Sequence, residues 1–285
     1  MVRVADISTK VICDEPAFFQ TISGPTSRFV VPDGPVDSTI RASWVARLAN
    51  PAGARLFDAG LTWRLYREQD DFIFTCLSPV LGPDPYRLAR LNASFTDGTI
   101  WLNRATVPRD AVLAPLDFPL DELLMINLLA RGRGVEVHAC GVIDQDGAGY
   151  LFPGQSGAGK STIARLWRDQ HATVLSDDRL ILRLRDGRVW MYGTPWHGED
   201  EFAAPASAPL SFIFFLAQGM PHQSRKMSGA SAAARLFACS FPPFYDAAGL
   251  DFTLALLGDI MERVPASELT FVPDPTVVSF VRSLT

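Results

Sequence analysis

The spacing of apolar residues changes near residue 115. Before it, short apolar or alternating runs at residues 28–31, 62–66 and 71–77 indicate β-strands, and residues 99–102 indicate one arm of a hairpin. Turn signals separate these runs: Pro32-Asp33-Gly34, Pro51-Ala52-Gly53, Gly82-Pro83-Asp84 and Asp97-Gly98, the last of which we expect to form the hairpin turn. The pattern predicts a β-rich domain over residues 1–115 with an accessory or substrate-selecting role.

From residue 116 onward, longer segments of helix-forming residues alternate with short apolar runs. Helices are expected over residues 120–130, 160–168, 230–238 and 247–263, with a last helix after Asp274-Pro275. Strands are expected over residues 135–142, 149–152, 174–175, 180–184, 189–192, 210–216 and 268–272. The alternation of the two kinds of element predicts an α/β domain over residues 116–285.

Composition and charge narrow the function classes. The chain has 26 lysines and arginines and 31 aspartates and glutamates, which gives a net charge of −5. This charge argues against non-specific binding of nucleic acid, because such binding requires a basic surface. The four cysteines include no C-x-x-C pair, as expected of reduced thiols in a cytosolic protein. Residues 1–15 lack the apolar core of a signal peptide, and the apolar run 210–217 is far shorter than the roughly 20 residues that span a bilayer. We therefore expect a cytoplasmic protein without a membrane partner.

A glycine-rich segment after the strand 149–152 matches the phosphate-binding pattern G-x-x-x-x-G-K-[ST] at every fixed position. It reads Gly154-Gln155-Ser156-Gly157-Ala158-Gly159-Lys160-Ser161, followed by Thr162. Glycines allow consecutive backbone N–H groups to converge on phosphate oxygens, and the helix that follows adds the positive end of its dipole. Lys160 can reach the β- and γ-phosphates, and the Ser161 hydroxyl can ligate Mg²⁺. With only three lysines in the chain, a chance match is improbable. The segment predicts binding of ATP with Mg²⁺.

Two adjacent carboxylates, Asp177-Asp178, end the next strand. Such a pair offers one carboxylate to a metal ion and another to accept a proton, and alternation along an extended chain aims the two in different directions. Alone the pair would be read as an acidic turn, but its position after a phosphate loop favours a functional role. His138, on the strand before the loop, could by itself be a core histidine.

Together these segments resemble a known family. Val137-His138-Ala139-Cys140-Gly141-Val142, the loop, and Leu175-Ser176-Asp177-Asp178-Arg179 are similar to the catalytic domain of HPr kinase/phosphorylase, a bacterial enzyme that phosphorylates a serine of the phosphocarrier protein HPr. The short gap between loop and acidic pair is typical of the HPr kinase and PEP carboxykinase type of core. The resemblance implies an α/β P-loop kinase domain of that type, preceded by the β-rich domain.

The resemblance also implies roles for single residues. Lys160 and Ser161 would hold the phosphates and Mg²⁺, Asp177 would be the general base, and Asp178 would assist the metal. His138 would lie close to the base and tune it. HPr kinases are hexameric, so a homo-oligomer is a further expectation.

One segment departs from the HPr kinase pattern. The second signature of that enzyme is absent, and Gly193-Thr194-Pro195-Trp196-His197-Gly198-Glu199 stands after the strand 189–192. This group is similar to one in HPr-kinase-related proteins encoded beside peptide-tailoring enzymes, including kinases of lasso peptides. Glu199 could complete a metal site, His197 could contact phosphate or substrate, and Trp196 could pack over either. A tight turn with a buried Trp is the structural alternative. Arg225 could contact a phosphate or an acidic substrate, or lie in a solvated loop.

The leading hypothesis is an ATP-dependent kinase that phosphorylates a hydroxyl, on a serine or threonine of a peptide or protein or on a small alcohol. A nucleotide-dependent regulatory protein with slow ATP hydrolysis is the alternative from another class. A small-molecule enzyme of the PEP carboxykinase type is the third hypothesis, and the sequence offers no residue set for oxaloacetate.

Overall fold

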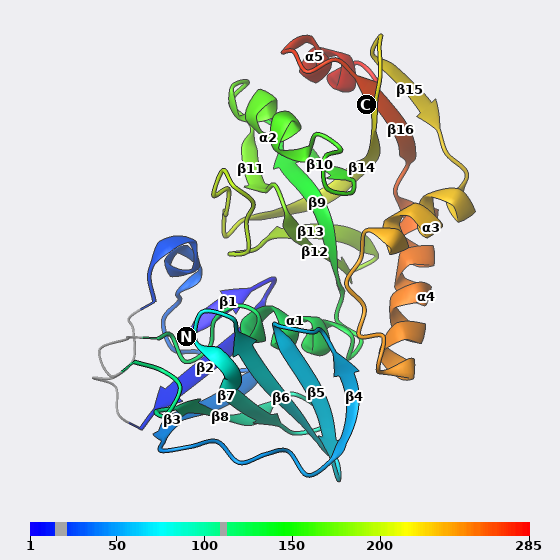
Figure 1. Cartoon of the computed structure of the whole chain (residues 1–285). Helices are drawn as coiled ribbons and strands as arrows, with labels where there is room; N and C mark the ends of the chain where they lie inside the picture. Colours follow the sequence, from blue (N-terminus) through cyan, green and yellow to red (C-terminus); the bar gives the residue numbers. More distant parts are fainter. Residues whose placement is uncertain (15–21, 109–112) are drawn as a thin grey trace. The chain divides into compact units, whose positions relative to one another are not determined.

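The computed structural model describes residues 1–14, 22–108 and 113–285, which form two compact units with mixed α/β content (Figure 1). Unit 1 comprises Met1–Ser23 and Val30–Leu128, and unit 2 comprises Gly24–Phe29 and Leu129–Thr285. The main part of unit 2 therefore begins at Leu129, the last residue of the first α-helix. A short segment of the N-terminal part belongs to unit 2.

Unit 1 contains one eight-stranded sheet with the order β1-β2-β3-β8-β7-β6-β5-β4. Its strands are β1 (Val2–Val4), β2 (Ile7–Cys13), β3 (Ser38–Val45), β4 (Ala54–Asp58), β5 (Trp63–Glu68), β6 (Asp71–Ser78), β7 (Gly82–Leu91) and β8 (Asp97–Asn103). The pairs β2–β3 and β3–β8 are parallel and the others antiparallel. Helix α1 (Leu120–Leu129) follows, with Leu120, Leu124 and Leu128 buried. The expected β-rich character of this part is confirmed.

Three predictions for residues 1–115 are wrong: the strand at residues 28–31 and the turns at residues 82–84 and 97–98. Residues 28–31 do not form a strand; Gly24–Phe29 is a 3-10 helix, η2, started by Gly-Pro and closed by the Ser27 hydroxyl, which donates to the Gly24 carbonyl. Gly82-Pro83-Asp84 opens β7 instead of turning.

Asp97-Gly98 lies inside β8, and the β7–β8 bend comes earlier, where the side-chain oxygen of Asn92 accepts the N–H groups of Thr96 and Asp97. Asparagine stabilises a bend in this way. Gly98 serves close packing, because an added Cβ would lie 2.3 Å from the Leu91 side chain.

Unit 2 is built on a second eight-stranded sheet with four helices. Its strands are β9 (Val135–Ile143), β10 (Gly149–Pro153), β11 (Thr173–Ser176), β12 (Arg179–Arg185), β13 (Arg188–Gly193), β14 (Ser207–Gln218), β15 (Gln223–Lys226) and β16 (Ala266–Phe271). Its helices are α2 (Lys160–Arg168), α3 (Gly229–Ala238), α4 (Ala247–Arg263) and α5 (Thr276–Arg282). The predicted helix 160–168 is confirmed, and the predicted strands 180–184 and 189–192 are present as the antiparallel hairpin β12–β13.

The two long strands β9 and β14 close part of this sheet into a ring of five paired strands. β9 pairs with β10 and with β12, while β14 pairs with β10 and with β13, so the pairing runs β9-β10-β14-β13-β12 and returns to β9. Two separate clusters of buried apolar side chains form the core of unit 2. Long strands with continuous apolar runs are suited to burial on both faces, and residues 213–216 of β14 are such a run and are all buried.

Four strands of unit 2 end at the same edge. β10 is parallel to β14, β14 is parallel to β16, and β11 runs the same way because both β11 and β10 are antiparallel to β9. The carboxyl ends of β11, β10, β14 and β16 therefore follow one another along one edge (Figure 1). Ligands of open α/β sheets bind outside such carboxyl ends. Within the described parts of the chain, no helix combines the length and apolarity required to cross a membrane.

Candidate functional site

The segment between β10 and α2 has a backbone that only glycines can supply. Gly157 and Gly159 have φ of 81° and 100°, in the left-handed region. A Cβ on Gly154 would lie 2.7 Å from the Ala158 Cβ, and one on Gly159 would lie 2.9 Å from the Phe271 ring. Gly159 caps α2 without a side-chain hydrogen bond. The first N–H groups of α2 thus lack the side-chain oxygen that usually caps a helix, as at helix ends that bind anions.

Lys160 is the first residue of α2 and is only 7% exposed. Its Nζ donates to the carbonyl oxygens of Gly154 at 2.9 Å and of Gln155 at 3.1 Å. Burial lowers the pKa of Lys160, and the nearby charge of Asp178 opposes that change. The ammonium group is therefore held inside the loop by carbonyls that phosphate oxygens could replace.

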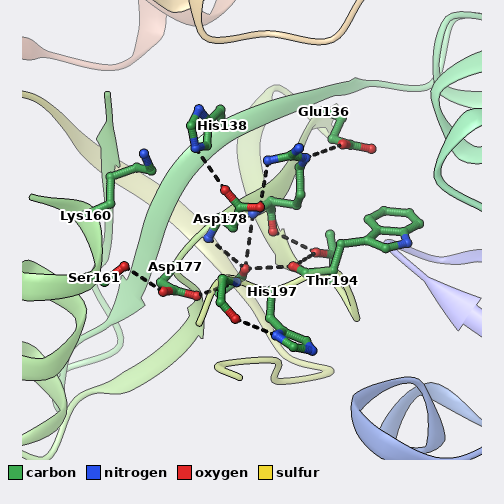
Figure 2. Close-up of polar contacts among 12 residues, drawn as sticks. Glu136, His138, Lys160, Ser161, Asp177, Asp178, Thr194 and His197 are labelled. Atoms are coloured by element: carbon green, nitrogen blue, oxygen red, sulfur yellow. Dashed lines mark hydrogen bonds and ion pairs between the residues drawn. The ribbon is translucent and has the colours of Figure 1, made fainter. Parts of the chain in front are cut away.

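Ser161 and Asp177 face each other. The Ser161 hydroxyl donates to Oδ2 of Asp177 at 2.9 Å, and the backbone N–H of Gly198 donates to Oδ1 at 3.0 Å (Figure 2). Asp177 is 2% exposed. Gly198 can approach this closely because it has no side chain: an added Cβ would lie 2.7 Å from Oδ2. A hydroxyl beside a buried carboxylate is an oxygen pair suited to Mg²⁺, which usually takes one or two protein carboxylates together with substrate phosphates.

Asp178 has different partners. Its Oδ1 lies 2.9 Å from Nε2 of His138 and its Oδ2 lies 2.8 Å from Nη1 of Arg179 (Figure 2). Burial raises the pKa of Asp178, but the hydrogen bond from His138 and the charges of Arg179, His138 and Lys160 outweigh burial and hold that pKa below its usual range. Asp178 is therefore an ionised carboxylate, and its side chain is 28% exposed.

Sequence reasoning missed two residues of this cluster. The ring of Phe241 lies 4.3 Å from the Arg179 guanidinium carbon and 6.4 Å from the His138 ring. Glu136, whose side chain is fully buried, lies 3.5 Å from Nε of Arg179. Glu136 could have been found, because it precedes His138 by two positions on β9 and so shares its face.

The segment from Thr194 to Asp200 lies beside the acidic pair. The Trp196 carbonyl accepts from the Ser176 hydroxyl and lies 3.1 Å from the Thr194 hydroxyl. His197 is half-buried, and its Nδ1 lies 2.7 Å from the Gly198 carbonyl. Asp200 binds Arg165 of α2 through two contacts of 2.7 and 3.0 Å. These contacts fasten the segment to α2 and β11.

Two candidate residues are not brought into the cluster. Glu199 is exposed, and no group of three or more His, Cys, Asp or Glu side chains placed to hold a metal occurs within residues 1–14, 22–108 and 113–285. Arg225 lies on the edge strand β15, where its guanidinium is 75% exposed and binds Glu268 at 2.9 Å. The other candidates, His138, Lys160, Ser161, Asp177 and Asp178, lie together around the loop (Figure 2).

Comparison with solved structures finds chains that resemble this one. The chain is similar to the Hpr(Ser) kinase/phosphatase from Coxiella burnetii, with a TM-score of 0.31 and 14% identity over 52% of this chain and 94% of that chain. No family model and no curated protein sequence matches the chain.

Proposed function

We propose that unit 2 binds ATP with Mg²⁺ and transfers the γ-phosphoryl group to a hydroxyl, that of a serine or threonine in a peptide or protein. The observation that carries the proposal is the division of two adjacent carboxylates beside a phosphate loop. Asp177 faces the loop hydroxyl of Ser161, while Asp178 faces His138 and Arg179. A kinase needs one oxygen set for the metal and another group for the acceptor proton.

The contacts favour Asp177 and Ser161 as the residues that hold Mg²⁺, and Asp178 as the general base. The role of Ser161 is that implied by the resemblance, whereas the roles of the two aspartates are exchanged. Ser161 and Asp177 lie 2.9 Å apart and present oxygen ligands to the same place. Bound Mg²⁺ would neutralise charge that develops on the phosphates. Gly198 contributes by fixing the orientation of the Asp177 carboxylate through its N–H.

The proton of the acceptor hydroxyl would pass to Asp178 as the hydroxyl oxygen bonds to the γ-phosphorus and the bond to the β–γ bridging oxygen breaks. ADP leaves with that oxygen. The loop N–H groups and the Lys160 ammonium would offset charge on the phosphates, a role supported by the position of Lys160 at the start of α2 within the loop. His138 and Arg179 hold Asp178 ionised, which leaves its carboxylate able to accept a proton, while the same contacts make it a weaker base.

Label transfer tests the proposal. The full chain is incubated with Mg²⁺ and ATP labelled on the γ-phosphate, with serine- and threonine-containing peptides as acceptors, and peptide label is counted separately from free phosphate. Asp178→Asn should lower transfer by about 10²- to 10⁴-fold, the usual contribution of a general base, with ATP affinity nearly unchanged. Release of free phosphate alone, at a rate that Asp178→Asn leaves untouched, would favour the regulatory protein with slow hydrolysis and overturn the kinase.

A further inference from the structure

The edge of the sheet in unit 2 has two sides that differ in chemistry. The order along it is β11, β9, β10, β14 and β16, with the phosphate loop at the end of β10. Asp177 and Asp178 come from the end of β11, on one side of the loop. The ends of β14 and β16 lie on the other side.

The loop is in direct contact with that second side. Nε2 of Gln218, the last residue of β14, donates to the Gly157 carbonyl at 2.9 Å. The ring of Phe271, the last residue of β16, packs so closely against Gly159 that a Cβ there would lie 2.9 Å away. Gln218 and Phe271 are themselves register partners. Gln218 and Phe271 therefore line the side of the loop that faces away from Asp177 and Asp178.

After Gln218 the chain turns from β14 into β15, and this turn carries the apolar side chain of Met220. Met220 is 82% exposed, although the turn that carries it is well anchored. His222, two residues later, accepts the Val272 N–H on Nδ1 at 3.1 Å, and its Nε2 lies 2.7 Å from the Thr276 hydroxyl. The His222 ring also stacks on Phe280. The turn is thus fastened to β16 and α5.

We infer that the nucleoside of the bound triphosphate lies against the β14–β15 turn, with its base on the Met220 side chain. A triphosphate in the loop has its reacting γ-phosphate near Asp178, so its other end leaves the loop on the side of β14 and β16. An exposed methionine fits this task, because a polarisable thioether makes favourable contacts with aromatic rings. The inference rests on the proposed nucleotide-binding function and adds the residue that distinguishes a nucleotide from a bare polyphosphate.

Calorimetry with two ligands separates the base from the phosphates. ATP and inorganic tripolyphosphate are titrated, each with Mg²⁺, into the full chain and into Met220→Ala. We expect Met220→Ala to weaken ATP binding about three- to tenfold, the scale of a sulfur–aromatic contact, and to leave tripolyphosphate binding unchanged. Leu254→Ala is the matched control, since it removes an exposed apolar side chain from α4 of the same unit and should change neither affinity.

The outcomes distinguish a failure of the Met220 inference from a failure of the proposed nucleotide binding. If Met220→Ala leaves ATP binding unchanged, or weakens both ligands equally, the base does not lie on Met220 and the inference is overturned. If the unaltered chain binds neither ATP nor tripolyphosphate, the proposed function itself fails.

Discussion

Among the described residues, each unit buries one long cationic side chain, and the two have different kinds of partner. In unit 1 the guanidinium of Arg87 is fully buried, forms an ion pair of 2.5 Å with Asp117, and donates to the carbonyls of Asp117 and Ala114. These partners tie β7 to the segment before α1. In unit 2 the buried ammonium of Lys160 is held by carbonyls of its own loop.

The difference separates a structural charge from a charge available to a ligand. Arg87 has a carboxylate committed to it and bonds to a fixed segment, so its removal would leave Asp117 without its partner. Lys160 has no directly bonded carboxylate among the contacts described, while two carboxylates lie nearby with partners of their own. Burying a cation with only neutral partners costs stability, and such a cost is typical of a binding site.

Removal of Arg87 tests this comparison with the largest expected effect. Arg87→Ala should lower the free energy of unfolding by about 2–5 kcal/mol, because it empties the space of a fully buried side chain and leaves the carbonyls of Asp117 and Ala114 without their donor. Chemical denaturation monitored by circular dichroism measures the loss. The double variant Arg87→Met with Asp117→Leu removes both charges and should recover much of it. If Arg87→Ala were as stable as the unaltered chain, Arg87 would not be a structural charge.

Lys160→Ala should show the converse. ATP affinity should fall by about 100-fold or more, equivalent to about 2.7 kcal/mol, while the free energy of unfolding stays unchanged or rises. Calorimetry and denaturation of the same preparation supply both numbers. A variant that unfolds readily yet binds ATP with its original affinity would place Lys160 in the same class as Arg87.

Gly198→Ala sharpens the role of Asp177. The added methyl group would meet Oδ2 of Asp177 and displace the carboxylate from Ser161. We expect about a tenfold higher Mg²⁺ concentration for half-maximal transfer, with a smaller change in the maximal rate. Gly187→Ala, at the β12–β13 turn where an added Cβ meets no neighbouring atom, is a control for glycine substitution, although its φ of 74° makes it mildly destabilising. A Mg²⁺ dependence that Gly198→Ala does not change would separate Asp177 from the metal.

The smallest effect concerns pH. The pKa of Asp178 lies below its usual range, so kcat/KM should fall only when the pH drops below the range in which aspartates ordinarily titrate. His138→Ala removes a hydrogen bond that lowers this pKa, so the pKa rises and the acid limb of the kcat/KM profile should move to higher pH. If the acid limb of the kcat/KM profile does not move, the role of His138 is purely structural.

Local signals explain what the sequence could predict. The loop and helix 160–168 follow from glycines, a lysine and a helix-forming run that are contiguous, and the β12–β13 hairpin follows from Asp186-Gly187. The ring closed by β14 could not be predicted, because it depends on a strand that pairs with both β10 and β13. The partners of Asp177 and Asp178 were equally hidden, since Gly198 and His138 reach them from distant parts of the chain.

The 3-10 helix η2 limits how this chain can be divided. Its flanking segments belong to unit 1, yet Gly24–Phe29 belongs to unit 2, where Phe29 is 2% exposed and Arg28 donates to the Ala203 carbonyl at 2.9 Å. A truncation that begins at Leu129 would remove the guanidinium that donates to the Ala203 carbonyl. An isolated unit 2 would therefore need residues 24–29 returned to it, as an added peptide or through a grafted linker.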